Sequence, residues 1–177
     1  MSQDSGLTQT IRIRPLLAAD VAAVLDIQVQ CYGADFVEPH AVFERRLQAR
    51  CQCSWAAERD GQVLAYLAAY WSLPGAVTPL NGEFAEYEQA SVLYLHDMAV
   101  SAAAAGQGVA RSLVQAAMAL ARERGVQETA LVSVQDSQAY WSRQGYWAQP
   151  LENAAQQQHL ATYGANALYM VGRVGKN

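Results

Sequence analysis

Short segments in which apolar and polar residues alternate predict several β-strands. Near the start of the chain, Ile11 and Ile13 are separated by arginine, which gives a strand one buried and one solvent-facing side. Residues 54–59 and 62–71 carry further strand patterns on either side of Asp60-Gly61, a dipeptide typical of a tight hairpin turn. The sequence therefore predicts a β-hairpin there.

Three other segments repeat apolar residues every three or four positions, the spacing of one face of an α-helix. In the first of them, Asp20 is expected to cap the helix and Gly33 to end it. The residues expected on its buried face are Val21, Val24, Leu25 and Val29. The three predicted helices span residues 20–33, 39–49 and 108–124.

The second half of the chain contains a strand–helix–strand unit, with strands at residues 92–100 and 128–134 around the third helix. A helical turn at 138–144, a strand from Tyr146, a polar loop rich in glutamine and a closing strand at 166–174 follow. The predicted fold class is α/β, with a central mixed, mostly antiparallel sheet of about six to seven strands and about four helices.

Length and composition fit one globular domain, because 177 residues of which 52% are hydrophobic can fill a core. Residues 1–10 are polar and are expected to be disordered, which leaves residues 11–177 as the single domain. No apolar run reaches the roughly 18 residues of a membrane helix, and the N-terminus lacks a signal-peptide pattern. A net charge of −4 argues against nucleic acid or a membrane as partner. We expect a cytoplasmic protein.

The cysteines Cys31, Cys51 and Cys53 are too few, and odd in number, for a disulfide framework. No second cysteine pair accompanies Cys51 and Cys53, and the histidines are scattered without ligand spacing. No metal site is expected.

Residues 73–90 contain two prolines, two glycines and few periodic apolar positions. A connection of this length is uncommon in a compact domain unless it has a function. The loop is therefore expected to cover a site.

Gly106 and Gly108 stand one residue apart where the third helix begins. A glycine inside a helix costs about 1 kcal/mol relative to alanine, so two at this place need a reason. The amides of a first helical turn have no partners within the helix, and glycine lets an anion approach them closely. The corner is predicted to bind a pyrophosphate. The alternative is one long helix from Ser101 to Arg124 that merely tolerates both glycines.

The glycine pair does not by itself identify the ligand. It lacks the third glycine of the dinucleotide fingerprint G-x-G-x-x-G, because Arg111 occupies that position. The lysine-bearing phosphate loop is also absent. An oxidoreductase with a nucleotide cofactor stays a weaker alternative.

The segments "HDMAV" (96–100) and "AGQGVA" (105–110), with the helix after them, resemble the acyl-CoA-binding core of the GNAT superfamily of N-acetyltransferases. The segment "YWSRQGY" (140–146) is similar to a second motif of that family, an aromatic pair, three spacers and a glycine followed by an aromatic residue. The order of the predicted elements after residue 10 agrees as well.

The resemblance implies a GNAT-like fold in which the two central parallel strands splay apart around the pantetheine arm of acetyl-CoA, the acetyl donor. An amine would attack the thioester directly. The cofactor-binding residues that it implies are Met98, Ala99 and Val100 along the arm, Ala105, Gly106, Gln107, Gly108, Val109 and Ala110 at the pyrophosphate, and Arg111, Ser137 and Trp141 nearby.

The chain departs from the family pattern at two positions. Ala105 stands where the family usually has arginine or glutamine, which removes a side-chain contact but keeps the backbone amides. Trp141 stands where many members carry the tyrosine that protonates the departing thiolate, and an indole N–H is not an acid. Tyr140 or water is left as proton donor. Ser137 is the one polar residue that could replace the family's asparagine.

Strand alternation places Tyr94, His96, Met98 and Val100 on one face of the central strand and Asp97 on the other, as a structural acceptor. Histidine changes its charge near neutral pH, and the arylalkylamine N-acetyltransferase branch carries a histidine at the position of His96 that is proposed to relay the proton. His96, Tyr94 and Tyr140 are the candidate catalytic residues. A purely structural role for His96 stays open.

The acceptor is expected to be the primary amine of a small molecule. The acidic residues that could attract a cation are Asp35, Glu38, Glu83, Glu86 and Glu88, with a solvated surface as the alternative. A non-catalytic acyl-CoA-binding module and a protein N-terminal or lysine acetyltransferase are the other functions considered. A homodimer is the commoner symmetric assembly, but the sequence leaves the oligomeric state open.

Overall fold

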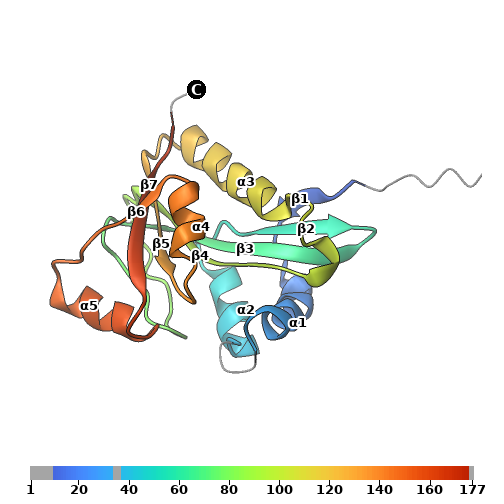
Figure 1. Cartoon of the computed structure of the whole chain (residues 1–177), viewed down its shortest axis with the longest axis horizontal. Helices are drawn as coiled ribbons and strands as arrows, with labels where there is room; N and C mark the ends of the chain where they lie inside the picture. The colour runs from blue at the N-terminus through green and yellow to red at the C-terminus, as the bar shows by residue number, and fades with distance from the viewer. Residues whose placement is uncertain (1–9, 34–36, 176–177) are drawn as a thin grey trace, which may run out of the picture.

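The computed structural model describes residues 10–33 and 37–175. Residues 1–9, most of the segment expected to be disordered, lie outside the described residues. One seven-stranded sheet has the order β1-β2-β3-β4-β5-β7-β6, and its neighbours are antiparallel except for β4 and β5 (Figure 1). The strands are β1 (Arg12–Pro15), β2 (Trp55–Arg59), β3 (Gln62–Ser72), β4 (Val92–Val100), β5 (Glu128–Ser133), β6 (Tyr146–Ala148) and β7 (Leu168–Arg173). The predicted α/β class is confirmed.

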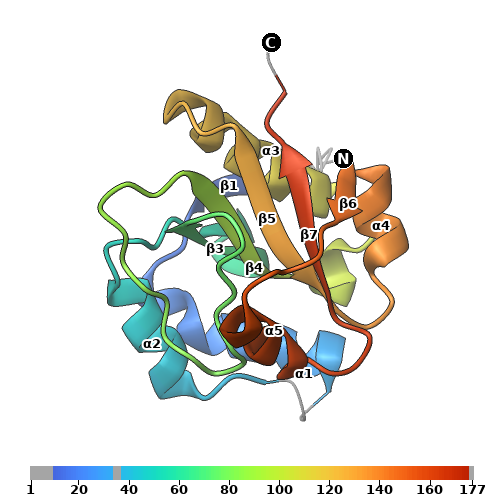
Figure 2. The same cartoon turned by 90° about the vertical axis from the view of Figure 1, so that its left-hand side faces the viewer.

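Helices cover both faces of the sheet (Figures 1 and 2). On one face lie α3 (Val109–Glu123) and α4 (Gln138–Arg143), and on the other lie α1 (Val21–Tyr32), α2 (His40–Gln48) and α5 (Ala154–Ala161). The short 3₁₀ helices η1 (Ala18–Asp20) and η3 (Ala102–Ala104) precede α1 and α3. The sheet is thus the middle layer of three.

The buried face of α1 differs slightly from the face predicted from the sequence. Val21, Val24 and Ile27 are buried, whereas Val29 is 52% exposed. Each residue turns the helix by about 100°, so a stripe that continues to Ile27 leaves Val29 on the solvent side. The Asp20 carboxylate also does not cap α1, because it accepts hydrogen bonds from Leu17 N and Arg14.

The glutamine-rich segment after β6 was expected to be a loop, and this was wrong, since it contains α5. Asn153 caps this helix, because its Oδ1 accepts hydrogen bonds from Ala155 N and Gln156 N. None of the helix's residues is fully buried. The segment therefore lacks the apolar period by which a helix is recognised in a sequence.

A β-bulge interrupts β4 in the middle of the sheet. The pairing with β3 passes from Ala69↔Leu95 to Ala68↔Asp97, so His96 is an extra residue without a partner. An extra residue reverses the side-chain alternation beyond it. His96 and Asp97 both face α1 and α2, while Met98 packs in the core beneath α3. The common face predicted for Tyr94, His96, Met98 and Val100, opposite Asp97, is wrong for this reason.

The two parallel strands separate directly beside the bulge. Their pairing begins at Val92↔Glu128 and ends at Leu95↔Leu131. From that point β4 continues to pair with β3, and β5 continues to pair with β7. The central pair is therefore open from residue 96 onward, as the predicted splay requires.

Candidate active site

The corner between β4 and α3 exposes backbone amides. The helix α3 begins only at Val109, after Gly106 and Gly108, whose φ angles are +74° and +76°. A Cβ added to either glycine would meet no atom within 4 Å. The alternative of one continuous helix from Ser101 to Arg124 is therefore wrong. Both glycines instead shape a turn whose inner side is open.

The same corner fits an anion. Among the described residues, no backbone carbonyl accepts a hydrogen bond from the amides of Gly106, Gly108, Val109, Ala110 or Arg111. The dipole of α3 adds partial positive charge at this end of the helix. Ala105 and Arg111 are exposed beside the corner, and the Gln107 side chain is engaged with Ala103 O and Arg59. The backbone alone thus supplies donors for a diphosphate.

A slot of about 200 Å³ lies where β4 and β5 separate. Its walls include Met98, Leu131, Ser137, Tyr140 and Trp141. Where β5 leaves the slot, Gln135 and Asp136 have φ angles of +49° and +58°, which residues other than glycine rarely adopt. Strain of this kind clusters at functional sites.

A second cavity, of about 80 Å³, adjoins the slot on the side of α1 and α2. The residues that line the second cavity but not the slot are Gln28, Glu38, Leu80 and Tyr163. The residues that line both cavities are Tyr32, His96, Asp97, Val132, Val134 and Gln135. We call the first cavity the slot, the second the acceptor cavity, and their common wall the junction.

The sequence-predicted site residues are distributed unevenly over these spaces. His96 lies at the junction, and Met98, Ser137, Tyr140 and Trp141 line the slot. Tyr94 is buried and lines neither cavity. The side chain of Ala99 is buried in the core under α1, and Val100 packs toward α3, so that any role of these two falls to their backbone.

Trp141 is a packing residue of the slot wall. It is 8% exposed and stands edge-on to Tyr146, with ring centroids 5.3 Å apart. Tyr140 stands edge-on to Trp141 at 5.1 Å, and burial raises the pKa of its phenol. Tyr140 is thus the ionisable aromatic residue of this wall.

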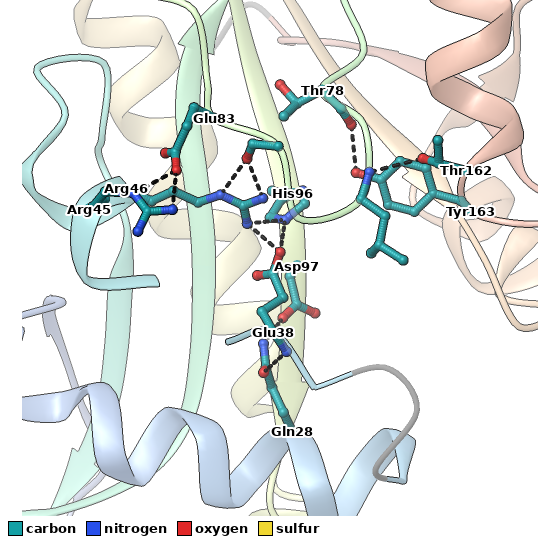
Figure 3. Close-up of polar contacts among 12 residues, drawn as sticks. Gln28, Glu38, Arg45, Arg46, Thr78, Glu83, His96, Asp97, Thr162 and Tyr163 are labelled. Atoms are coloured by element: carbon teal, nitrogen blue, oxygen red, sulfur yellow. Dashed lines mark hydrogen bonds and ion pairs between the residues drawn. The ribbon is translucent and has the colours of Figure 1, made fainter. Parts of the chain in front are cut away.

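Arg46 is the centre of a buried polar cluster that includes Glu38 and His96, two residues of the acceptor-cavity wall (Figure 3). Its side chain is 0% exposed and forms an ion pair with Glu38. Its Nε and Nη2 donate to the carbonyl oxygen of Gly82 at 3.0 and 2.6 Å. Its Nη1 also lies 2.9 Å from Nε2 of His96. Every nitrogen of this guanidinium therefore has a partner.

His96 and Glu38 each present one unpartnered polar atom beside the acceptor cavity. Within the described chain, His96 Nδ1 and Glu38 Oε2 are buried and have no hydrogen-bond partner. Burial by itself raises the pKa of the Glu38 carboxyl, but its contacts with His96 and Arg46 lower the pKa to about 2. Glu38 is consequently an anion at neutral pH.

A second polar cluster surrounds Asp97 at the junction. Its carboxylate accepts hydrogen bonds from Gln28 Nε2 at 2.9 Å, from Tyr32 OH at 2.8 Å and from Tyr66 OH. Tyr32 OH also lies 2.7 Å from the carbonyl oxygen of Met98. A hydroxyl has a single hydrogen, so Tyr32 cannot donate to Asp97 and to Met98 at once. Burial, with the Asp97 charge next in effect, raises the pKa of Tyr32.

The loop between β3 and β4 lies over the acceptor cavity, to which it contributes Leu80. On one side Arg46 holds it by Gly82 O. On the other side Thr162 Oγ1 accepts from Leu80 N at 2.9 Å, and Tyr163 OH donates to Thr78 O at 2.7 Å (Figure 3). The loop thus joins α2 to the segment after α5 and covers a cavity, as the sequence predicted.

The acidic residues expected to attract a cation separate into two groups. Glu83 pairs with Arg45 and Glu86 with Arg50 at the exposed surface. Asp35 lies outside the described residues. Of the other four predicted acids, Glu38 is the one that lines the acceptor cavity.

Sequence reasoning missed Arg46, considered Tyr32 only as part of an aromatic wall of the acceptor site, and gave Asp97 only a structural role. A signal for Arg46 was present, because Val42, Phe43 and Arg46 share one face of α2 at helical spacing and all three are buried. A charged residue on an apolar helix face is seldom buried without a partner. The hydrogen bond of Tyr32 with Asp97 had no sequence signal, since it depends on how α1 packs on β4.

Across residues 10–33 and 37–175, no group of three or more His, Cys, Asp or Glu side chains is arranged to hold a metal ion. In that same part of the chain, no helix combines the length and apolar character needed to cross a bilayer.

Solved structures share this architecture at low sequence identity. The Escherichia coli ribosomal-protein-S18-alanine N-acetyltransferase superposes with a TM-score of 0.70 at 15% identity, covering 95% of this chain and 96% of its own. The GNAT-like decarboxylase GphF, solved with isobutyryl-CoA, gives 0.71 at 16% identity, covering 93% and 100%. Escherichia coli YhbS, solved with CoA, gives 0.62 at 18% identity, covering 95% and 83%. At these identities the likeness shows the fold.

The sequence of the chain identifies the family to which it belongs. No curated protein gives a significant match to the chain. The model of the Acetyltransferase (GNAT) family matches residues 21–146, a span from α1 to the start of β6 that includes the corner, the slot and the junction. Since this is well over half of the chain, the resemblance seen in the sequence is confirmed: the protein belongs to the GNAT acetyltransferase family.

Proposed function

We propose that the protein transfers the acetyl group of acetyl-CoA to the primary amine of a small molecule. One observation carries the proposal: the parallel strands part after Leu95↔Leu131, and the slot so formed shares a wall of titratable side chains with a second cavity. An acyl donor and an acceptor can therefore meet at the junction. Acetyl-CoA supplies the activated thioester.

The binding roles follow from the positions of the backbone. The amides of Gly106 and of Gly108 to Arg111 hold the pyrophosphate, and β4 leads from that corner into the slot. The exposed backbone of Met98 to Val100 lies along the pantetheine arm, because β4 no longer pairs with β5 there. Arg111 adds charge at a phosphate, and Ser137 adds a polar group at the slot wall.

Tyr32 and Asp97 are proposed to remove the proton from the attacking amine. When Asp97 is ionised, Tyr32 OH can donate its hydrogen either to Asp97 or to the carbonyl oxygen of Met98. The other of these two acceptors then receives no hydrogen bond from Tyr32. The amine nitrogen gives a proton to the Tyr32 oxygen while Tyr32 passes its own hydrogen to Asp97. Asp97 is then protonated, and the new hydrogen of Tyr32 can be donated to the carbonyl oxygen of Met98. The N–H bond breaks and an O–H bond forms on Asp97, so the transfer balances.

His96 is proposed to act as a hydrogen-bond donor. Because Arg46 occupies Nε2, the neutral ring carries its hydrogen on Nδ1, which is buried and has no partner within the described chain, and His96 lines both cavities. A donor at this place can polarise the acyl carbonyl. Tyr140, which lines the slot, is proposed to give a proton to the departing thiolate.

The dimensions of the site favour a small acceptor over a protein chain. The acceptor cavity measures about 80 Å³, and the loop that covers it is tied on two sides. A peptide would require an open groove instead. The free thiols of Cys31, Cys51 and Cys53 fit a reducing compartment, and we propose that the enzyme works in the cytoplasm.

A non-catalytic acyl-CoA-binding module is the second candidate. The packing of Trp141 against Tyr146, at the position of the family's acidic tyrosine, favours it. Such a module would bind acetyl-CoA without turnover.

A ligand comparison followed by a thiol assay tests these functions. Acetyl-CoA is expected to raise the melting temperature of the protein, and NAD(P) is not. Release of free thiol with a panel of small amines would support catalysis. Binding without thiol release from any amine would support the module, and no stabilisation by acetyl-CoA would overturn both.

A further inference from the structure

We propose that the acceptor is a small amine with an apolar body and no carboxylate, and that Glu38 binds its nitrogen. This inference rests on the proposed function and narrows it. Its basis is the distribution of charge and of hydrogen-bonding groups around the acceptor cavity, in which Glu38 offers a free anionic oxygen and no cation among the described lining residues is free to answer a carboxylate.

The unpartnered oxygen of Glu38 belongs to a buried side chain that Arg46 holds in place. The side chain is 5% exposed, and its Oε1 is paired with Arg46 Nη1. The other oxygen, Oε2, is buried without a partner in the described chain. A buried carboxylate oxygen without a donor is costly, so a ligand that brings an N–H to it gains the most from binding.

Arg46 balances the charge of the Glu38 carboxylate but leaves one of its oxygens without a donor among the described residues. It is positioned on the Oε1 side, and its nitrogens are all engaged with Glu38, His96 and the Gly82 carbonyl. The arginine is therefore not available to bind a substrate carboxylate. It holds Glu38 in one orientation, in which Oε2 has no donor among the described residues.

The charged residues that line the acceptor cavity are both acidic. They are Glu38 and Asp97, and no lysine or arginine is among the described lining residues. A cationic amine is attracted by such walls, whereas an amino acid would bring its carboxylate against two anions. These walls therefore favour amines without a carboxylate over amino acids.

The remaining walls are apolar. The apolar lining of this cavity of about 80 Å³ consists of Leu80, Val132, Val134 and the ring of Tyr163. These side chains fit an alkyl or aromatic body that follows the nitrogen. Loss of the carboxylate from an amino acid leaves such an amine, so decarboxylation is the class of reaction that supplies this substrate.

The unmodified enzyme tests the inference with pairs of acceptors that differ only in the carboxylate. Suitable pairs are tyramine with tyrosine and 2-phenylethylamine with phenylalanine. We expect kcat/KM to be about 100-fold higher for the amine in at least one pair, from the loss of a charged contact and the added repulsion. Equal or faster acetylation of the amino acids would overturn the inference and leave the proposed function standing. Acetyl-CoA binding with no turnover of any amine or amino acid would overturn both.

A pair of double variants tests the role of Glu38 without relying on activity. Glu38→Gln with Arg46→Gln removes both buried charges together, because Glu38→Gln alone would leave Arg46 buried without a counterion. Calorimetry is expected to show amine affinity reduced about 10- to 100-fold and acetyl-CoA affinity unchanged. The control, Glu83→Gln with Arg45→Gln, removes an exposed pair between the same helix, α2, and the loop that follows β3. Unchanged amine affinity in the first variant, confirmed as folded by circular dichroism, would overturn the role of Glu38.

Discussion

Arg46 Nη1 lies 2.9 Å from Nε2 of His96, and this contact sets the state of the imidazole. A guanidinium is always charged and can only donate, so the contact requires Nε2 to accept, and the neutral ring cannot at the same time donate from Nε2 to Glu38 Oε1, which lies 3.4 Å away. The neutral ring then has its hydrogen on Nδ1. For His96 to act as a base, the contact with Arg46 would have to break, whereas no such rearrangement is needed for Asp97.

The pH profile should distinguish Asp97 from His96 as the proton acceptor. Asp97→Asn is expected to lower kcat by about 100-fold and to flatten the acidic limb of kcat/KM, because the amide does not take the proton. His96→Gln keeps an oxygen that accepts from Arg46, and we expect it to lower kcat but to preserve the shape of the profile. The reverse pattern would assign the base to His96.

The glycine corner can be tested with two glycines at opposite ends of the same helix. Gly108 and Gly125 both have positive φ, +76° and +70°, and a Cβ added to either would meet open space, but Gly125 follows the far end of α3. Alanine at either position should cost about 1 kcal/mol of stability through the strained backbone. We expect only Gly108→Ala to weaken CoA binding, by at least about 10-fold, as measured by calorimetry. Equal CoA affinity in the two variants would remove the corner from the pyrophosphate site.

Two neighbouring arginines of α2 should differ strongly in their contribution to stability. Arg46→Met leaves Glu38 buried without its partner and is expected to cost about 3–5 kcal/mol of unfolding free energy. Arg45→Met removes a pair whose side chains are 57% and 51% exposed, and it should cost about 0–1 kcal/mol. Urea unfolding of both variants measures the contrast. Similar losses would mean that the Arg46 cluster is not a stabilising part of the fold.

Stability at low pH should report the Glu38 carboxylate. Its pKa in the folded protein is lowered from 4.5 to about 2 by its neighbours against the effect of burial, so the folded state holds the proton less tightly than the unfolded state. The resulting stabilisation, about 3 kcal/mol, is present above pH 4.5 and is lost as the pH falls toward 2. Urea unfolding at a series of pH values should show this loss in the natural protein. The loss should be smaller in the Glu38→Gln, Arg46→Gln double variant.

Tyr140 can be tested by removing a single oxygen. Tyr140→Phe keeps the ring that packs on Trp141 and is expected to lower kcat by about 100-fold with little change in acetyl-CoA affinity. Tyr87→Phe, in a tyrosine that lines neither the slot nor the acceptor cavity, is the matched control. Unchanged turnover in Tyr140→Phe would leave protonation of the thiolate to water.

The sequence by itself determined the elements and the glycine corner. Alternation along β2 and β3, the turn at Asp60-Gly61 and the helical spacing of α3 depend on neighbours in the chain, and such local patterns predict local structure. The same holds for Gly106 and Gly108, whose backbone conformation is a property of a short segment. The family motifs lie in these segments, which is why the resemblance was visible before the structure.

Only the tertiary structure decided the chemistry at the junction. One extra residue at His96 turns Asp97 to the face of α1, and no local pattern announces a bulge whose register is set by pairing with β3. The contact of Arg46 with His96 joins residues 50 positions apart, and that of Tyr32 with Asp97 joins residues 65 apart. Such contacts arise when helices pack on a sheet, so the orientation of each donor and acceptor follows from burial and packing and not from the order of residues.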